Sequence, residues 1–251
     1  MSWRFALTPK WIIRHVLVAA LVVTMIALGL WQLRRLDEKR TYKDLVEARQ
    51  EQPAVDVTEL PASATADEVL YRSVRATGTY RAEDTVVVEN RTLNGAPGGW
   101  VLTPLRLDDG LTVVINRGFI GFNRDGAVVP PAPPDGAVTV TGLLFPSQRR
   151  GSFGPTDLCE DRVEVLARVD LDCYGRQLGV DLFPTYVQLV TSDPQEPAAA
   201  EGAPQLVALG PPEPDEGPHL AYAVQWFIFT TIAAGGYVLL LRKVALVNQP
   251  V

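Results

Sequence analysis

Two long apolar runs lie near the ends of the chain, and short apolar and polar stretches alternate between them. The runs 16–33 and 220–241 contain no charged residue. A helix that crosses the hydrocarbon core of a bilayer needs roughly 20 apolar residues. Each run therefore predicts a transmembrane helix. Segments 1–15 and 242–251 are then the two terminal segments that lie beyond these helices.

A cleaved signal peptide is the alternative interpretation of the first run. The run is longer than the usual apolar stretch of a signal peptide, and no small-residue cleavage site follows Leu30. The sequence WQLRRLDEKR, residues 31–40, instead continues as a charged helix. We favour an uncleaved anchor.

Charges around the second run predict its orientation. Arg242 and Lys243 follow the run, whereas three acids precede it within 213–216. Because basic residues stay on the cytoplasmic side, we expect a cytoplasmic C-terminus. Two spans place both termini on one side, so segments 1–15 and 242–251 are predicted to be cytoplasmic.

The middle of the chain predicts a mainly antiparallel β (α+β) extracytoplasmic domain over 34–190, a sheet or small barrel. It begins with a helix over 34–52, ended by Pro53. β-branched, partly alternating stretches predict strands at 71–80, 85–90, 100–107, 111–120, 137–144 and 185–190.

Turn and cap residues add detail to this domain. Asp108, Asp109 and Gly110 predict a hairpin between two strands. A short helix is expected from Leu171, ended by Gly179. The stretch 191–219 is rich in Pro, Ala and Glu and predicts a linker, in which 205–209 can add an edge strand.

Composition excludes several functions. The net charge of -6 argues against nucleic acid as a partner. Two Cys, two Met and two His are too few and too scattered for copper delivery. The middle domain has neither a nucleophile motif nor a Cys-x-x-Cys pair, so we do not expect an enzyme.

The two cysteines, Cys159 and Cys173, lie close together in sequence. In an oxidising compartment they most simply form a structural disulfide. A redox role is the alternative, and it lacks the spacing that usually supports it.

Three segments, in order, resemble the surfeit locus protein 1 family. They are WQLRRLDEK (31–39), GGWVLTPLRLDDGLTVVINRGFIG (98–121) preceded by ENR (89–91), and HLAYAVQWFIF (219–229). The resemblance implies a factor that assembles haem-copper cytochrome c oxidase and passes haem a toward its catalytic subunit. It implies residence in the plasma membrane of a bacterium, with the mitochondrial inner membrane as the alternative.

The resemblance implies that His219 is the axial ligand of the haem a iron, at the outer end of the second helix. The family often has Asn just before this His, where this chain has Pro218. On a helix His219, Tyr222 and Trp226 share one face, so both aromatic rings are candidates to contact the porphyrin. The alternative is an interfacial His in an aromatic belt, which is also how we interpret His15.

The remaining candidate residues match the family's other motifs. Trp31 is either an interfacial anchor or a haem contact packed near His219. The other four, from the mid-domain motifs, are Arg91, Asn116, Arg117 and Gly118. We favour a structural role for these four residues over contact with haem propionates or the oxidase. In that role Arg117, which precedes Gly118, fixes a turn.

These observations favour an assembly factor whose working site lies on the helix pair and whose β-rich domain docks to the oxidase. The alternative is a stable accessory subunit of a respiratory oxidase complex without haem of its own. Membrane lipid and the oxidase are the expected partners.

Overall fold

A computed structural model of the chain describes residues 3–61, 65–123, 126–152, 164–199 and 201–247. The chain divides into two compact units, one made of Met1–Leu45 with Glu213–Val251 and one of Val46–Pro212. The first is helical and the second is rich in strands. This confirms the predicted fold class.

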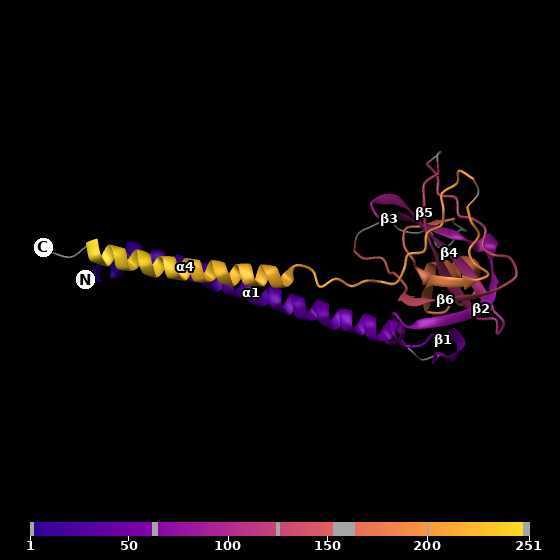
Figure 1. Cartoon of the computed structure of the whole chain (residues 1–251), viewed down its shortest axis with the longest axis horizontal. Helices are drawn as coiled ribbons and strands as arrows, with labels where there is room; N and C mark the ends of the chain where they lie inside the picture. Colours follow the sequence, from indigo (N-terminus) through magenta and orange to yellow (C-terminus); the bar gives the residue numbers. More distant parts are fainter. Residues whose placement is uncertain (1–2, 62–64, 124–125, 153–163, 200, 248–251) are drawn as a thin grey trace. The chain divides into compact units, whose positions relative to one another are not determined.

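The helical unit contains α4 (His219–Val247) and most of α1 (Pro9–Gln50), with a short 3-10 turn at Arg4–Leu7. Within the described residues, these two helices are long and apolar enough to cross a membrane. They run side by side in opposite directions, so the start of α1 and the end of α4 lie at one end of the pair (Figure 1). α1 passes unbroken from the apolar run into the charged stretch that follows it, and it ends three residues before Pro53.

The β-rich unit contains the six main strands that the sequence predicts. They are β2 (Ser73–Tyr80), β3 (Val86–Leu93), β4 (Ala96–Leu107), β5 (Thr112–Gly121), β6 (Ala137–Pro146) and β8 (Thr185–Asp193). Two very short strands, β1 (Val55–Asp56) and β7 (Val165–Leu166), have no clear sequence signal and pair in parallel with β2 and β3. β8 extends three residues into the stretch assigned to the linker.

In the described part of the chain, five strands close into a barrel in the order β2-β6-β8-β5-β4. Closure comes from the last residues of β2, because Gly78 to Tyr80 pair with β4 while Gly78 and Thr79 also pair with β6. A Cβ atom on Gly78 would lie 2.2 Å from the carbonyl oxygen of Arg106. Only glycine permits this approach, so Gly78 is the corner that turns an open sheet into a barrel.

Alternating side chains of the barrel strands fill two separate cores. Val113 and Ile115 of β5 point into a cluster with β2, β4, β6 and β8, whereas Val114 between them joins a second cluster. The second cluster packs against α3 (Leu171–Leu178) and includes Tyr174. Burial on both faces explains why β5 reads as an almost continuous apolar run.

Short polar interactions fix the ends of these elements as the sequence predicts. The Asp170 side chain caps α3 by accepting from the amide of Cys173 at 3.0 Å, and Gly179 ends the helix with φ +65°. The β4–β5 hairpin turns at Gly110, with φ +91°. The predicted edge strand at 205–209 is reduced to a single bridge between Val207 and Phe119.

Candidate functional site

The two helices of the first unit meet along a regular seam. Their less exposed positions recur every three or four residues, the spacing at which side chains of two paired helices interlock. On α1 these positions include His15, Val18, Val22, Met25, Leu28, Gly29, Gln32 and Leu36. On α4 they include His219, Ala223, Trp226, Phe227, Thr230, Ala233 and Tyr237.

Gly29 allows the closest approach along this seam. A Cβ atom there would lie 2.8 Å from Cζ of Phe227, so the ring of α4 occupies the space that a side chain on α1 would need. Small residues let membrane helices approach closely, and packing of this kind drives their association. The glycine therefore fixes how the helices pair just before the polar end of the seam.

At that end, Nδ1 of His219 lies 2.8 Å from Oε1 of Gln32. A carboxamide oxygen only accepts hydrogen bonds, so the ring donates through Nδ1–H. The proton on Nδ1 leaves the lone pair of Nε2 free in the neutral imidazole. Ligating histidines in metal sites are usually held in this way, with the second nitrogen donating to an oxygen acceptor.

The backbone before α4 leaves room beside that free nitrogen. Gly217 has φ +68°, and a Cβ atom on it would lie 3.4 Å from both Nε2 and Cδ2 of His219. Pro218 does not disturb the helix start, because its carbonyl accepts the amide of Tyr222 at 3.1 Å. The departure from the family's usual Asn is thus compatible with a regular first turn.

The predicted aromatic neighbours of His219 lie on different parts of the helix surface. Trp226 is half-buried and meets Phe229 edge to face at 6.1 Å. Tyr222 is 48% exposed and Trp31 is 50% exposed, so both rings point away from the seam. The structure therefore brings Gln32 together with His219, while Trp31 and Tyr222 present their rings outward.

His15 lies in the seam at the opposite end of the helix pair. Its Nε2 lies 3.1 Å from the carbonyl oxygen of Ala6, and its Nδ1 lies 2.5 Å from Oη of Tyr237. The carbonyl requires a donor, so Nε2 carries the proton and Nδ1 accepts from the phenol. Both nitrogens are occupied within the protein, which distinguishes this histidine from His219.

In the β-rich unit, the motif Asn116-Arg117-Gly118 lies inside the predicted strand and forms a β-bulge there rather than a turn. The register of β4 with β5 shifts there, so Arg117 is an extra residue without a partner on β4. Gly118 has φ +142°, and a Cβ atom on it would lie 2.4 Å from the carbonyl oxygen of Val207. Asn116 supports the bulge, since its Oδ1 accepts from the amide of Gly118 at 3.2 Å.

The Arg117 side chain is fully buried and neutralised. Its Nε donates to Oε1 of Glu196 at 3.0 Å, and its two Nη atoms donate to the carbonyls of Pro131 and Ala132. The guanidinium thereby ties two loops to the barrel wall. Sequence reasoning missed Glu196, because it lies in the Pro-rich stretch assigned to the linker.

Arg91 lies on β3 beside Trp100 of β4. Its guanidinium carbon is 4.4 Å from the centre of the Trp100 ring, and its Nη2 donates to Oε1 of Gln148 at 3.1 Å. Burial lowers the pKa of Arg91, and nearby Tyr186 raises it while nearby Arg168 lowers it. The residue as a whole is half-buried, and its Nε is buried.

Of the two cysteines, Cys173 is buried in α3 and packs in the second core. Cys159 lies outside the described residues, so the predicted pairing of Cys159 with Cys173 stays a prediction.

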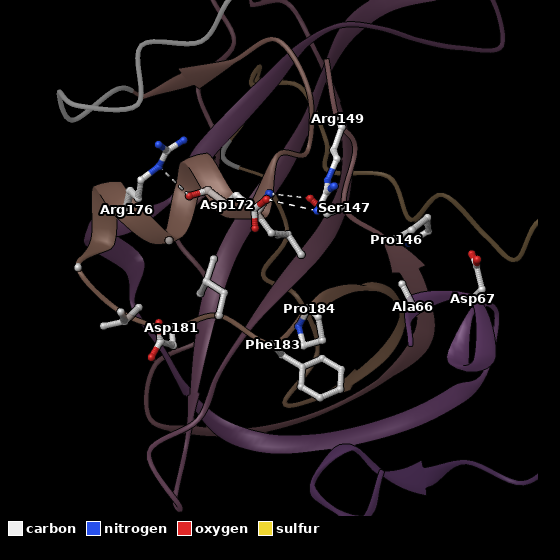
Figure 2. A pocket seen from close by; sticks show the side chains of 15 residues that line it. Ala66, Asp67, Pro146, Ser147, Arg149, Asp172, Arg176, Asp181, Phe183 and Pro184 are labelled. Atoms are coloured by element: carbon white, nitrogen blue, oxygen red, sulfur yellow. Dashed lines mark hydrogen bonds and ion pairs between the residues drawn. The ribbon is translucent and has the colours of Figure 1, made fainter. Parts of the chain in front are cut away.

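A cavity of about 1180 Å³ opens beside α3 in the same unit. Figure 2 shows Ser147 and Arg149, which follow β6, facing Asp172 of α3. Phe183 and Pro184 form an apolar part of the wall. The cavity is lined by both acidic and basic side chains, and none of the predicted site residues lines it.

Comparison with known proteins assigns the chain to a family. The SURF1 family matches residues 19–231. A SURF1-like protein of Mycobacterium tuberculosis is 29% identical over 92% of this chain and 83% of its own length. A SURF1-like protein of Rickettsia felis is 24% identical over 81% of this chain and 85% of its own length.

A yeast protein is also similar. The cytochrome oxidase assembly protein SHY1 of Saccharomyces cerevisiae is 31% identical over 55% of this chain and 37% of its own length. The family match covers α1 from residue 19 onward, the strands, and α4 as far as residue 231. This chain belongs to the SURF1 family.

Proposed function

We propose that the protein is a non-catalytic assembly factor for a haem-copper cytochrome c oxidase, which holds haem a through His219 and aids its insertion into the catalytic subunit. Family membership and the similarity to a yeast cytochrome oxidase assembly protein support the role in assembly. The observation that carries the haem site is the hydrogen bond between Gln32 and His219.

The residues at this end of the helix pair fit a haem ligand. The bond to Gln32 uses Nδ1 of His219 as the donor, so Nε2 is the nitrogen available to haem iron. Gly217 leaves space beside that nitrogen. Haem a, when bound, would supply the iron, and His219 would hold it through Nε2.

The helix pair also supports a membrane location. Helices that run in opposite directions put both chain ends on one side of a bilayer. Arg242 and Lys243 follow the apolar run of α4 at that end, whereas three acids precede it within 213–216, so the positive-inside rule favours the cytoplasm for both chain ends. His219 then lies at the opposite, outer face of the plasma membrane of a bacterium, as does the β-rich unit.

Removal of the gene tests the assembly role. Cells that lack the protein are expected to contain oxidase catalytic subunit with much less haem a than normal cells. The haem a content per catalytic subunit is measured after purification of the oxidase. An oxidase with its full haem a complement in these cells would overturn the proposal.

Co-purification separates an assembly factor from a stable accessory subunit. An assembly factor is expected to co-purify with the immature catalytic subunit. It is expected to be present in far less than equal amount in purified mature oxidase. Equal stoichiometry with the mature, active complex would favour the accessory subunit instead.

A further inference from the structure

A β-bulge at Glu89 and Asn90 determines where the Arg91 side chain points. Val88 pairs with Trp100, but Arg91 pairs with Gly98, so β3 contains one extra residue between the two pairs. Asn90 takes it up with φ +57°, which is unusual for a residue other than glycine. Bulges of this kind redirect side chains.

The extra residue moves Arg91 to the face of the sheet that carries Trp100. Positions 98 and 100 of β4 share one face, because side chains alternate along a strand. Arg91 opposes Gly98, which has no side chain, and so its guanidinium can extend over the Trp100 ring at 4.4 Å. Without the bulge the guanidinium would point to the other face.

One further contact holds the guanidinium in place, and its acceptor is itself held by the backbone. Nη2 of Arg91 donates to Oε1 of Gln148 at 3.1 Å, and the same oxygen accepts from the amide of Val169 at 3.2 Å. The amide of Gln148 in turn donates to the carbonyl of Val169 at 2.7 Å. The acceptor is therefore fixed by the backbone, and the arginine is preorganised.

The charge of Arg91 lacks a counter-ion among the described residues. Its Nε is buried without a hydrogen-bond acceptor there, and no carboxylate in the described ranges lies within ion-pair distance of its guanidinium. Arg117 in the same unit shows the contrast, because Glu196 neutralises it. A half-buried arginine without a carboxylate is costly to maintain, and such groups commonly serve recognition.

We propose that Arg91, held flat on Trp100, is the docking point for a carboxylate side chain of a protein partner. Under the proposed function that partner is the oxidase catalytic subunit, and only this identification rests on the proposed function. A planar guanidinium with free N–H groups recognises a carboxylate through paired hydrogen bonds. Arg91 and Trp100 are both half-buried within the face of a sheet, which suits a facing protein surface better than a porphyrin that needs an enclosing apolar pocket.

A capture experiment tests this inference. The tagged full chain is used to capture the catalytic subunit from cells that assemble the oxidase. Arg91→Gln is expected to lower the captured amount about tenfold, as loss of a partly buried charge pair does. Arg91→Lys is expected to restore capture only in part, because lysine keeps the charge but not the planar fork. Arg106→Gln, which removes an exposed arginine of β4, serves as the matched control and is expected to capture as much as the wild type.

Salt dependence and haem content distinguish a carboxylate of a protein partner from a haem propionate. Capture by the wild type is expected to weaken as salt rises, and the residual capture by Arg91→Gln to be insensitive to salt. The inference is overturned if Arg91→Gln captures normal amounts. It is also overturned if this variant loses haem a while capture is unchanged, which would assign the carboxylate to a haem propionate.

A purely structural role for Arg91 predicts a different result. In that case Arg91→Gln and Arg91→Lys would lower the thermal unfolding midpoint in parallel with capture, and the salt dependence of capture would survive in Arg91→Gln. If the wild-type chain captures no catalytic subunit at all, the proposed function fails and the partner assigned to Arg91 fails with it.

Discussion

Nδ1 of His219 lies 2.8 Å from Oε1 of Gln32, although 187 positions separate the two residues in sequence. The contact joins the last turn of the apolar run of α1 to the first residue of α4. It turns an interfacial histidine into one with a defined tautomer and a free Nε2. The proposed ligation of haem on the helix pair depends on this relationship.

Replacement of Gln32 tests whether it positions the ligand. Gln32→Leu removes the acceptor and is expected to weaken haem a binding by about 10–100-fold, the usual effect of losing the partner of a ligating histidine. Gln32→Glu keeps an acceptor and is expected to bind at least as well as the wild type. Both are measured by titration of the purified full chain with haem a. Equal affinity of Gln32→Leu and wild type would remove the positioning role.

Gly29 tests the packing of the helices that builds this site. Gly29→Leu places a side chain where the Phe227 ring lies and is expected to destabilise the helix pair by about 1–3 kcal/mol. Gly236→Leu is the matched control, because a Cβ atom at Gly236 meets nothing within 4 Å. Thermal unfolding in detergent compares the two, and Phe227→Ala is expected to rescue Gly29→Leu. Similar unfolding midpoints for both leucine variants would contradict the close packing of Gly29 against Phe227.

Gly78 tests barrel closure. Gly78→Val forces a side chain against the backbone of Arg106 and is expected to lower the free energy of unfolding by about 3 kcal/mol or more. Gly121→Val is the control, since a Cβ atom at Gly121 has no neighbour within 4 Å. Resistance of the full chain to proteolysis reports the difference. A Gly78→Val variant as resistant as the control would mean that β2 does not close the barrel at this point.

Tyr80 makes the stability of the barrel depend on pH in the alkaline range. Its Oη is buried without a hydrogen-bond partner in the described part of the chain. Burial raises the pKa of Tyr80 above its ordinary value of 10.0, Glu196 raises it further, and Arg117 partly offsets the rise. The folded protein thus holds the phenol proton more tightly than the unfolded chain. The stabilisation is complete below about pH 10 and is lost as pH rises above it.

Tyr80→Phe is therefore expected to stabilise the protein. The gain at neutral pH is about 1 kcal/mol, because the unpaired hydroxyl is removed. The loss of stability above pH 10 is expected to shrink, and buried Tyr186, whose pKa burial also raises, accounts for part of what is left. Unfolding midpoints between pH 7 and pH 11 provide the measurement. An unchanged alkaline loss in Tyr80→Phe would show that Tyr80 ionises as freely in the folded protein as in the unfolded chain.

Sequence reasoning reached the elements of this fold because each has a local signal. The uncharged runs predict the two helices, and alternation with turn residues such as Gly110 predicts the strands. Barrel closure has no local signal, because it depends on a contact between Gly78 and the backbone of Arg106. The short strands β1 and β7 were missed for the same reason, since partner strands determine them.

The site was predictable only in part. His219 and Gln32 stand out at the ends of the two apolar runs, but only their pairing in space assigns the tautomer. The strand around Arg117 was predicted, but its Arg-Gly pair forms a bulge and not a turn, and the bulge before Arg91 was not predicted. Strand register depends on the pairing of two segments, so one sequence stretch does not reveal an extra residue.

The amount of haem a bound by His219→Ala tests the central claim most directly. The full chain, its His219→Ala variant and a His15→Ala control are purified from cells that make haem a, and haem a per protein is measured from the absorption spectrum. Wild type and His15→Ala are expected to carry haem a, and His219→Ala is expected to carry none. Unchanged spectra and stoichiometry in His219→Ala would contradict the assignment of His219 as the ligand.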